Sequence, residues 1–94
     1  MITAQEAHQA GLVARIFNPD ELLDKTVEVA QEIANYSKPV VMMAKESVNK
    51  AFETTLREGL VFERRLFHST FSTEDQKEGM SAFAEKRKPN FKDK

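Results

Sequence analysis

Residues 56–71 read LREGLVFERRLFHSTF, and the fold class follows from this stretch. At 100° per residue, its large apolar side chains cover roughly 180° of a helix surface. These side chains are Leu56, Leu60, Phe62, Leu66, Phe67 and Phe71. A helix that packs on one core needs only ~100° of apolar surface, so this helix is predicted to contact two surfaces. We expect it to pack against another subunit, with a monomeric helical core as the alternative.

Helix start signals on both sides of this stretch predict further helices. Thr55 and Glu58 have the spacing of a capping box, and Thr73 precedes an acidic first turn. The last helix is expected to end near Lys86. Ahead of them, Ser37-Lys38-Pro39 ends one helix and begins the next, which carries apolar residues on one face as far as Phe52.

The N-terminal part of the chain predicts a short helix, an extended segment and a longer helix. Thr3 and Glu6 form a first capping box, and Gly11 supplies a left-handed helix end. Asn18 is expected to cap a helix that ends near Tyr36. Between them, residues 12–17 (LVARIF) favour an extended segment that has no second strand to pair with, so its partner is expected outside this chain. The fold class is therefore all-α for the most part, with four to five helices and one unpaired extended segment near residues 12–17.

Composition excludes several classes of protein. The 94 residues include 14 basic and 15 acidic side chains, which argues against a nucleic-acid partner or an anionic membrane surface. There is no cysteine and there are only two histidines, so neither a disulfide framework nor a Cys/His metal site is expected. The apolar runs are far shorter than the ~20 residues of a membrane span, and no targeting segment is visible.

The residues that could carry catalysis are better explained as surface groups. Glu46 and Glu53 lie seven residues apart and share a helix face, but Lys45 and Lys50 on the same helix indicate a solvated surface. His68 projects onto the polar side of its helix, and His8 has no acidic partner in metal-ligand register. We therefore predict no catalytic residue and no metal ligand in this chain.

The C-terminal stretch is the one place where a binding site can be suggested from residue types alone. Phe83 lies one turn before Lys86 and Arg87, so an aromatic ring and cations share one side of the predicted helix end. A ring that stacks and a cation that pairs with an anion suit an adenine ring with phosphates. A solvated charge run at the negative end of a helix explains the same residues.

Several stretches of this sequence resemble the enoyl-CoA hydratase (crotonase) family. Residues 2–13, ITAQEAHQAGLV, match an element that is shared across that superfamily. Residues 62–67 (FERRLF), 73–80 (TEDQKEGM) and 82–91 (AFAEKRKPNF) follow in the family's order and are more specific. The resemblance covers essentially the whole chain and is strongest to the short-chain, mitochondrial-type hydratase.

The resemblance implies that this chain is the C-terminal third of such an enzyme. Residues 1–17 would be the tail end of the crotonase core, and residues 18–94 the C-terminal helical oligomerisation domain. The parent would hydrate a 2-enoyl-CoA thioester to the 3-hydroxyacyl-CoA in fatty-acid β-oxidation, in the mitochondrial matrix. Its oxyanion-hole amides and two catalytic glutamates would precede Ile2, so the chain alone is expected to be inactive.

The resemblance also implies binding partners. Phe83 and Lys86 match the positions expected to contact coenzyme A (CoA), which enters as part of the substrate and not as a separate cofactor. Self-association as a trimer, or as a dimer of trimers, is expected of the parent. The alternatives are a free-standing helical interaction module, and the same domain of an isomerase or hydrolase of the superfamily.

Overall fold

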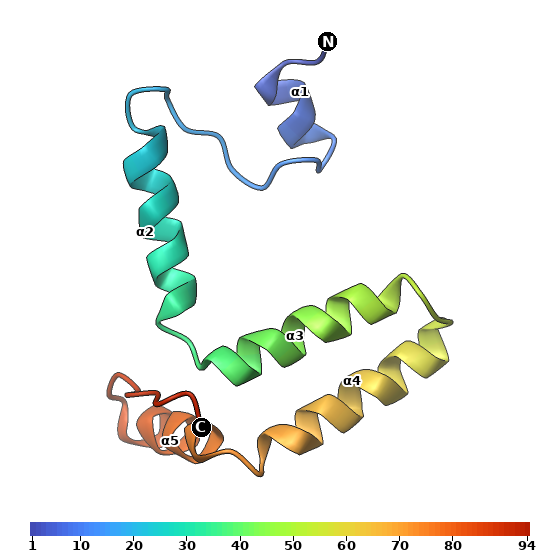
Figure 1. The fold of residues 1–94 in the computed structure, drawn as a ribbon, viewed down its shortest axis with the longest axis vertical. Coiled ribbons are helices and arrows are strands. Elements are labelled where there is room, and N and C mark those ends of the chain that lie inside the picture. The colour runs from blue at the N-terminus through green and yellow to red at the C-terminus, as the bar shows by residue number, and fades with distance from the viewer. The chain divides into compact units, whose positions relative to one another are not determined.

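The structure is a computed structural model that describes all of residues 1–94. It contains five helices and no strand (Figure 1). They are α1 (Ala4–Gln9), α2 (Leu22–Ala34), α3 (Lys38–Ala51), α4 (Leu56–Thr70) and α5 (Glu74–Glu85). The all-α prediction is therefore confirmed. The chain forms two compact units, Met1–Gln31 and Glu32–Lys94, which are described separately. The division predicted between residues 17 and 18 stays a prediction.

In the first unit, α1 forms as its capping residues predict. The Thr3 hydroxyl accepts from the Glu6 amide, and the Glu6 carboxylate accepts from the Thr3 amide at 2.7 Å. The bonds that the Glu6 carboxylate accepts from the Thr3 amide, and then from the Thr3 hydroxyl, lower the pKa of Glu6. Gly11 then takes a positive φ of 75°, which a glycine adopts without a Cβ clash.

Residues 12–17 pair with no strand in this chain, as predicted, and the expectation that a partner lies outside the chain stays a prediction. The amides of Leu12 and Val13 donate to the Ala7 carbonyl, at 2.8 and 3.4 Å, and so turn the chain back onto the end of α1. The rest of the segment is irregular. These local hydrogen bonds involve only the first two residues of the segment.

The start of α2 lies later than predicted. Asn18 does not cap the helix, because its side chain donates to the Glu21 carboxylate and residues 19–21 form a turn. The helix begins at Leu22 and ends at Ala34, two residues before the predicted end at Tyr36.

In the second unit, α3 and α4 form an antiparallel hairpin (Figure 1). Pro39 lies in the first turn of α3, where a missing amide proton costs nothing. Thr55 caps α4 by accepting from the Glu58 amide, but the reciprocal Glu58 bond of a complete capping box is absent. Thr73 caps α5 by accepting from the Gln76 amide at 3.1 Å.

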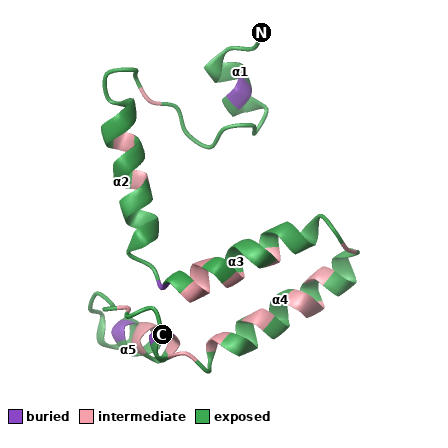
Figure 2. Ribbon diagram, viewed as in Figure 1, coloured by how far each residue is buried: buried purple, intermediate pink, exposed green.

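The chain buries very little apolar surface (Figure 2). Only Ala7 and Ala82 are buried hydrophobic residues, and no large side chain is fully buried. On α4, Leu56 is 80% exposed and Phe67 is 59% exposed, although α3 packs along one side of the helix. The wide apolar surface of α4 is thus only partly covered within the chain.

None of the five helices has both the length and the apolar composition of a membrane span.

Candidate functional site

Phe83 and Lys86, the two predicted site residues, lie at the C-terminal end of α5. Phe83 is in the last turn and is 82% exposed. Lys86 is the first residue beyond the helix, is exposed, and makes no ion pair within the chain. An exposed ring and an unpaired ammonium group therefore lie three residues apart at one helix end.

The backbone at this helix end is unusual for a lysine. Lys86 has φ 55° and ψ 39°, the left-handed conformation that normally favours glycine. Its amide donates to the Phe83 carbonyl at 3.3 Å, and the Arg87 amide donates to the Ala82 carbonyl at 3.0 Å. This is the hydrogen-bond pattern of a Schellman motif, which satisfies the last carbonyls of the helix.

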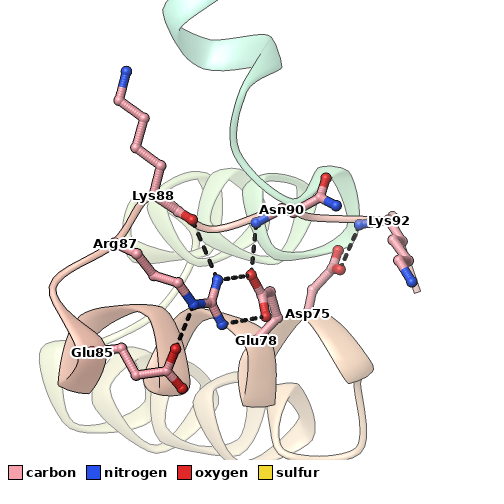
Figure 3. Close-up of polar contacts among 7 residues, drawn as sticks. All are labelled: Asp75, Glu78, Glu85, Arg87, Lys88, Asn90 and Lys92. Atoms are coloured by element: carbon pink, nitrogen blue, oxygen red, sulfur yellow. Dashed lines mark hydrogen bonds and ion pairs between the residues drawn. The ribbon is translucent and has the colours of Figure 1, made fainter.

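The sequence predicts that Arg87 shares a helix face with Phe83. The structure does not place the two residues on one face. The helix ends at Glu85, and the Arg87 guanidinium instead turns back onto α5 (Figure 3). Its Nη1 and Nη2 donate to the two Glu78 carboxylate oxygens, at 2.6 and 3.0 Å, and its Nε donates to Glu85 at 2.7 Å. This bidentate ion pair neutralises the charge of Arg87, so Arg87 is not available to bind a ligand.

The residues after Arg87 return along α5 and are held mainly by their main-chain groups. The Asn90 amide donates to Glu78 at 2.8 Å, and the Lys92 amide donates to Asp75 at 2.7 Å (Figure 3). The Lys94 carbonyl accepts from the Asp75 amide at 3.0 Å. We refer to residues 87–94, bound in this way to α5, as the C-terminal strap.

The strap also reaches α3. The Asp93 carboxylate accepts from the Lys38 amide at 2.7 Å, which satisfies one of the free amides at the start of α3. The Ser37 side chain makes no capping bond. The bond that caps α3 therefore comes from Asp93, which lies 55 positions after Lys38. The Phe91 ring fills the space beside Gly79, where a Cβ would meet it at 3.4 Å.

The carboxylates that hold the strap stay ionised to low pH. Hydrogen bonds from Arg87, and then from the Asn90 amide, lower the pKa of Glu78 to about 2. Burial alone would raise the pKa of Asp75, which is 2% exposed, but the bond from the Lys92 amide and neighbouring donors outweigh it and the pKa is lowered. The hydrogen bonds that Arg87 makes to Glu78, and then to Glu85, raise the pKa of Arg87.

Two of the α5 residues that hold the strap, Glu78 and Glu85, are not indicated by any sequence pattern considered above. Glu78 lies nine residues before Arg87, which is not a helical spacing, so no pattern within one helix indicates the pair. The left-handed conformation of Lys86 could not be predicted from the sequence either, because a glycine, the usual sign of that conformation, is absent from this position.

The groups that could carry acid–base chemistry are scattered. Glu46 lies on the exposed surface of α3, and Glu53 lies in the turn that follows it. His68 is exposed in the last turn of α4, and His8 is exposed in α1. No three histidine or carboxylate side chains come together as a metal-binding set.

A second surface lies between α3 and α4. It is an open, mostly apolar groove of about 500 Å³. Its apolar lining includes Val40, Met43, Val48 and Phe52 of α3, and Leu66 and Phe67 of α4. The Phe67 ring meets Phe71 edge-on, with ring centres 5.4 Å apart. We refer to this surface as the α3/α4 groove.

Comparison with known proteins identifies the family. The family model described as enoyl-CoA hydratase/isomerase matches residues 1–94. A probable enoyl-CoA hydratase of Rhizobium meliloti is 58% identical over 92 residues, covering 98% of this chain and 36% of that protein. The mitochondrial enoyl-CoA hydratase of Pongo abelii is 56% identical over 92 residues, covering 98% of this chain and 32% of that protein.

A solved structure agrees with both sequence relatives. Enoyl-CoA hydratase subunit I of Geobacillus kaustophilus superposes with a TM-score of 0.95 at 44% identity, covering 99% of this chain and 36% of that one. This chain thus spans about a third of the length of the proteins it matches, and those relatives include a bacterial and a mitochondrial protein. On these grounds the chain belongs to the enoyl-CoA hydratase/isomerase family.

Proposed function

We propose that this chain is the C-terminal helical part of an enoyl-CoA hydratase. The intact enzyme would add water across the double bond of a 2-enoyl-CoA thioester, as a step of fatty-acid β-oxidation. Within it, this chain supplies subunit contacts and part of the site for the adenine end of CoA. Family membership supports the reaction, and the end of α5 supports the CoA contact.

The observation that carries the CoA proposal is the state of Phe83 and Lys86. The ring is 82% exposed, and the ammonium group makes no ion pair within the chain. Arg87, the next cation, is already neutralised by carboxylates. Lys86 is therefore free to pair with a phosphate while Phe83 offers a face for a purine to stack on.

The chain alone is proposed to be inactive. In the family's reaction two backbone amides polarise the thioester carbonyl and two glutamates move the protons. Glu6, Glu21, Glu46 and Glu53 do not match those positions, so no catalytic role is assigned to them. The hydration of crotonyl-CoA can be measured as the loss of enoyl-thioester absorbance. The reaction should proceed with the intact enzyme and be undetectable with residues 1–94.

The test of the CoA contact is Lys86→Ala in the intact enzyme. Loss of a contact remote from the reacting bond should raise KM for the acyl-CoA about fivefold and leave kcat within about twofold. Lys88→Ala is the matched control, because it removes the same charge from a side chain that points away from the Glu78–Arg87 pair (Figure 3). A large loss of kcat at unchanged KM would refute the assignment.

One alternative reaction follows from the family model, whose description names isomerases beside hydratases. An isomerase would shift the double bond of the same thioester without adding water. Mass analysis of the product from the intact enzyme separates the two, because hydration adds the mass of water and isomerisation adds nothing. The CoA contact proposed for Phe83 and Lys86 would be common to both.

A further inference from the structure

The CoA contact proposed above depends on a lysine in a backbone conformation that a lysine does not favour. A non-glycine residue in the left-handed region is strained, and it persists only where its surroundings hold it. Lys86 has this conformation at φ 55°. The question is therefore which groups hold it there.

The residue directly after Lys86 is fixed at both its main chain and its side chain. The Arg87 amide donates to the Ala82 carbonyl at 3.0 Å, while its guanidinium is gripped by Glu78 and Glu85. Because one peptide unit joins the two residues, holding Arg87 at both points also holds the direction in which Lys86 leaves the helix.

Glu78 is the group on which most of this arrangement depends. Its carboxylate takes both Nη donors of Arg87 and also accepts from the Asn90 amide at 2.8 Å. One side chain in the middle of α5 therefore anchors the chain on both sides of Lys88 and Pro89 (Figure 3). Its side chain is 25% exposed, so solvent competes only partly for these bonds.

We propose that Glu78 is a positioning residue for CoA binding: through Arg87 it fixes the turn that presents Lys86 beside Phe83. This inference rests on the proposed function, since it requires Lys86 to contact CoA. Glu78 itself touches no substrate. It acts by keeping Lys86 in one orientation before the ligand arrives, which lowers the ordering cost of binding.

The test uses Glu78→Gln in the intact enzyme, because glutamine keeps the shape of the side chain and removes its charge. KM for an enoyl-CoA should rise about fivefold with kcat within about twofold, matching the effect of Lys86→Ala. Glu74→Gln is the control, since it makes the same change on α5 at an exposed residue that has no bond to the strap. It should leave both constants unchanged.

Two further measurements separate positioning from general damage. With an enoyl-pantetheine thioester, which lacks the adenine nucleotide, Glu78→Gln should behave like the wild type. In the double variant with Lys86→Ala, the Glu78 change should add nothing to KM, since its effect passes through Lys86. An effect that adds in full, or that is equal with the truncated substrate, would show a merely structural role and overturn the inference.

The outcomes also distinguish this inference from the proposed function. If Lys86→Ala raises KM and Glu78→Gln does not, the positioning role is wrong and the CoA contact stands. If Lys86→Ala leaves KM unchanged, the CoA contact fails, and the positioning role fails with it.

Discussion

At the scale of single residues, the chain relies on carboxylates that accept from main-chain amides. Asp75 accepts from the Lys92 amide, Glu78 from the Asn90 amide and Asp93 from the Lys38 amide. Bonds to an ionised acceptor are shorter and stronger than neutral ones. They also make the packing of the strap depend on ionisation.

The strap should accordingly open in acid. The pKa of Glu78 is lowered from 4.5 to about 2 in the folded chain, so its contribution to stability is complete above pH 4.5. That contribution is lost as the pH falls from 4.5 towards 2, where the folded carboxylate takes up a proton. We expect the Asn90 amide to lose hydrogen-exchange protection across this window, as followed by NMR.

Glu78→Gln provides the control for the pH experiment. A glutamine does not titrate, so protection of the Asn90 amide should be lower at neutral pH and change much less between pH 4.5 and 2. Any remaining acid dependence would report Asp75, whose pKa is also lowered. A wild-type Asn90 amide that stays equally protected throughout would contradict the assigned bond.

Which site residues the sequence could predict depended on the range of their interactions. Phe83 and Lys86 are suggested by their residue types and spacing and matched by the family resemblance, and their exposure agrees with a binding role without testing it. Glu78 was missed because its partners lie 9 and 12 residues away, across a turn that no glycine announces. Helical periodicity identifies neighbours that lie three or four residues apart. It gives no information about pairs that lie nine or twelve residues apart across a turn.

At the scale of elements, the helices with local start signals were predicted best. Thr55 and Thr73 cap α4 and α5 as expected, and Pro39 marks the first turn of α3. Asn18 misled because a turn with Glu21 competes for the same side chain. The 12–17 segment is unpaired as predicted, but its composition does not reveal that two of its amides donate to the Ala7 carbonyl.

The cap of α5 gives a prediction at this scale. Thr73→Ala removes the acceptor of the Gln76 amide and should destabilise α5 by about 1 kcal/mol. Because the strap is bound to α5, its amides should lose protection together with the first turn of the helix. Hydrogen exchange at Gln76 and Asn90 measures both, with an expected loss of about fivefold.

Thr73→Ser is the matched control, since serine keeps the hydroxyl and should retain most of the protection. If Thr73→Ala weakened the first turn of α5 and left the strap untouched, the two would not form one cooperative unit.

At the scale of the whole molecule, the dominant feature is apolar surface with nothing packed on it. Nineteen large hydrophobic side chains are exposed, and no large side chain is fully buried. Apolar patches of this kind mark surfaces that pack against another chain or domain. The wide apolar arc of α4 indicates such a surface from the sequence alone, whereas the identity of what covers it requires the partner.

Self-association is the corresponding prediction. Phe67→Asp places a charge at the centre of the exposed surface of α4, where burial against a second subunit would cost several kcal/mol. The intact enzyme carrying this change should shift to a smaller mass in light scattering over a dilution series. An unchanged mass would refute the role of α4 in subunit contact.

Ser69→Asp is the control for that experiment, because it adds the same charge two residues along the helix, on the opposite face. The assembly should keep its mass in this variant. Equal dissociation by both changes would indicate a general effect of negative charge on α4.

The way in which the strap is bound determines how its sequence can vary among relatives. The carboxylates of α5 hold the amides of Asn90 and Lys92, so the side chains at these two positions contribute no bond to α5. They can drift through evolution while the backbone path is kept, and proline is the one replacement that removes the donor itself. Among the residues that bind the strap to α5, the side chains of Asp75, Glu78 and Arg87 are therefore the ones expected to be constrained.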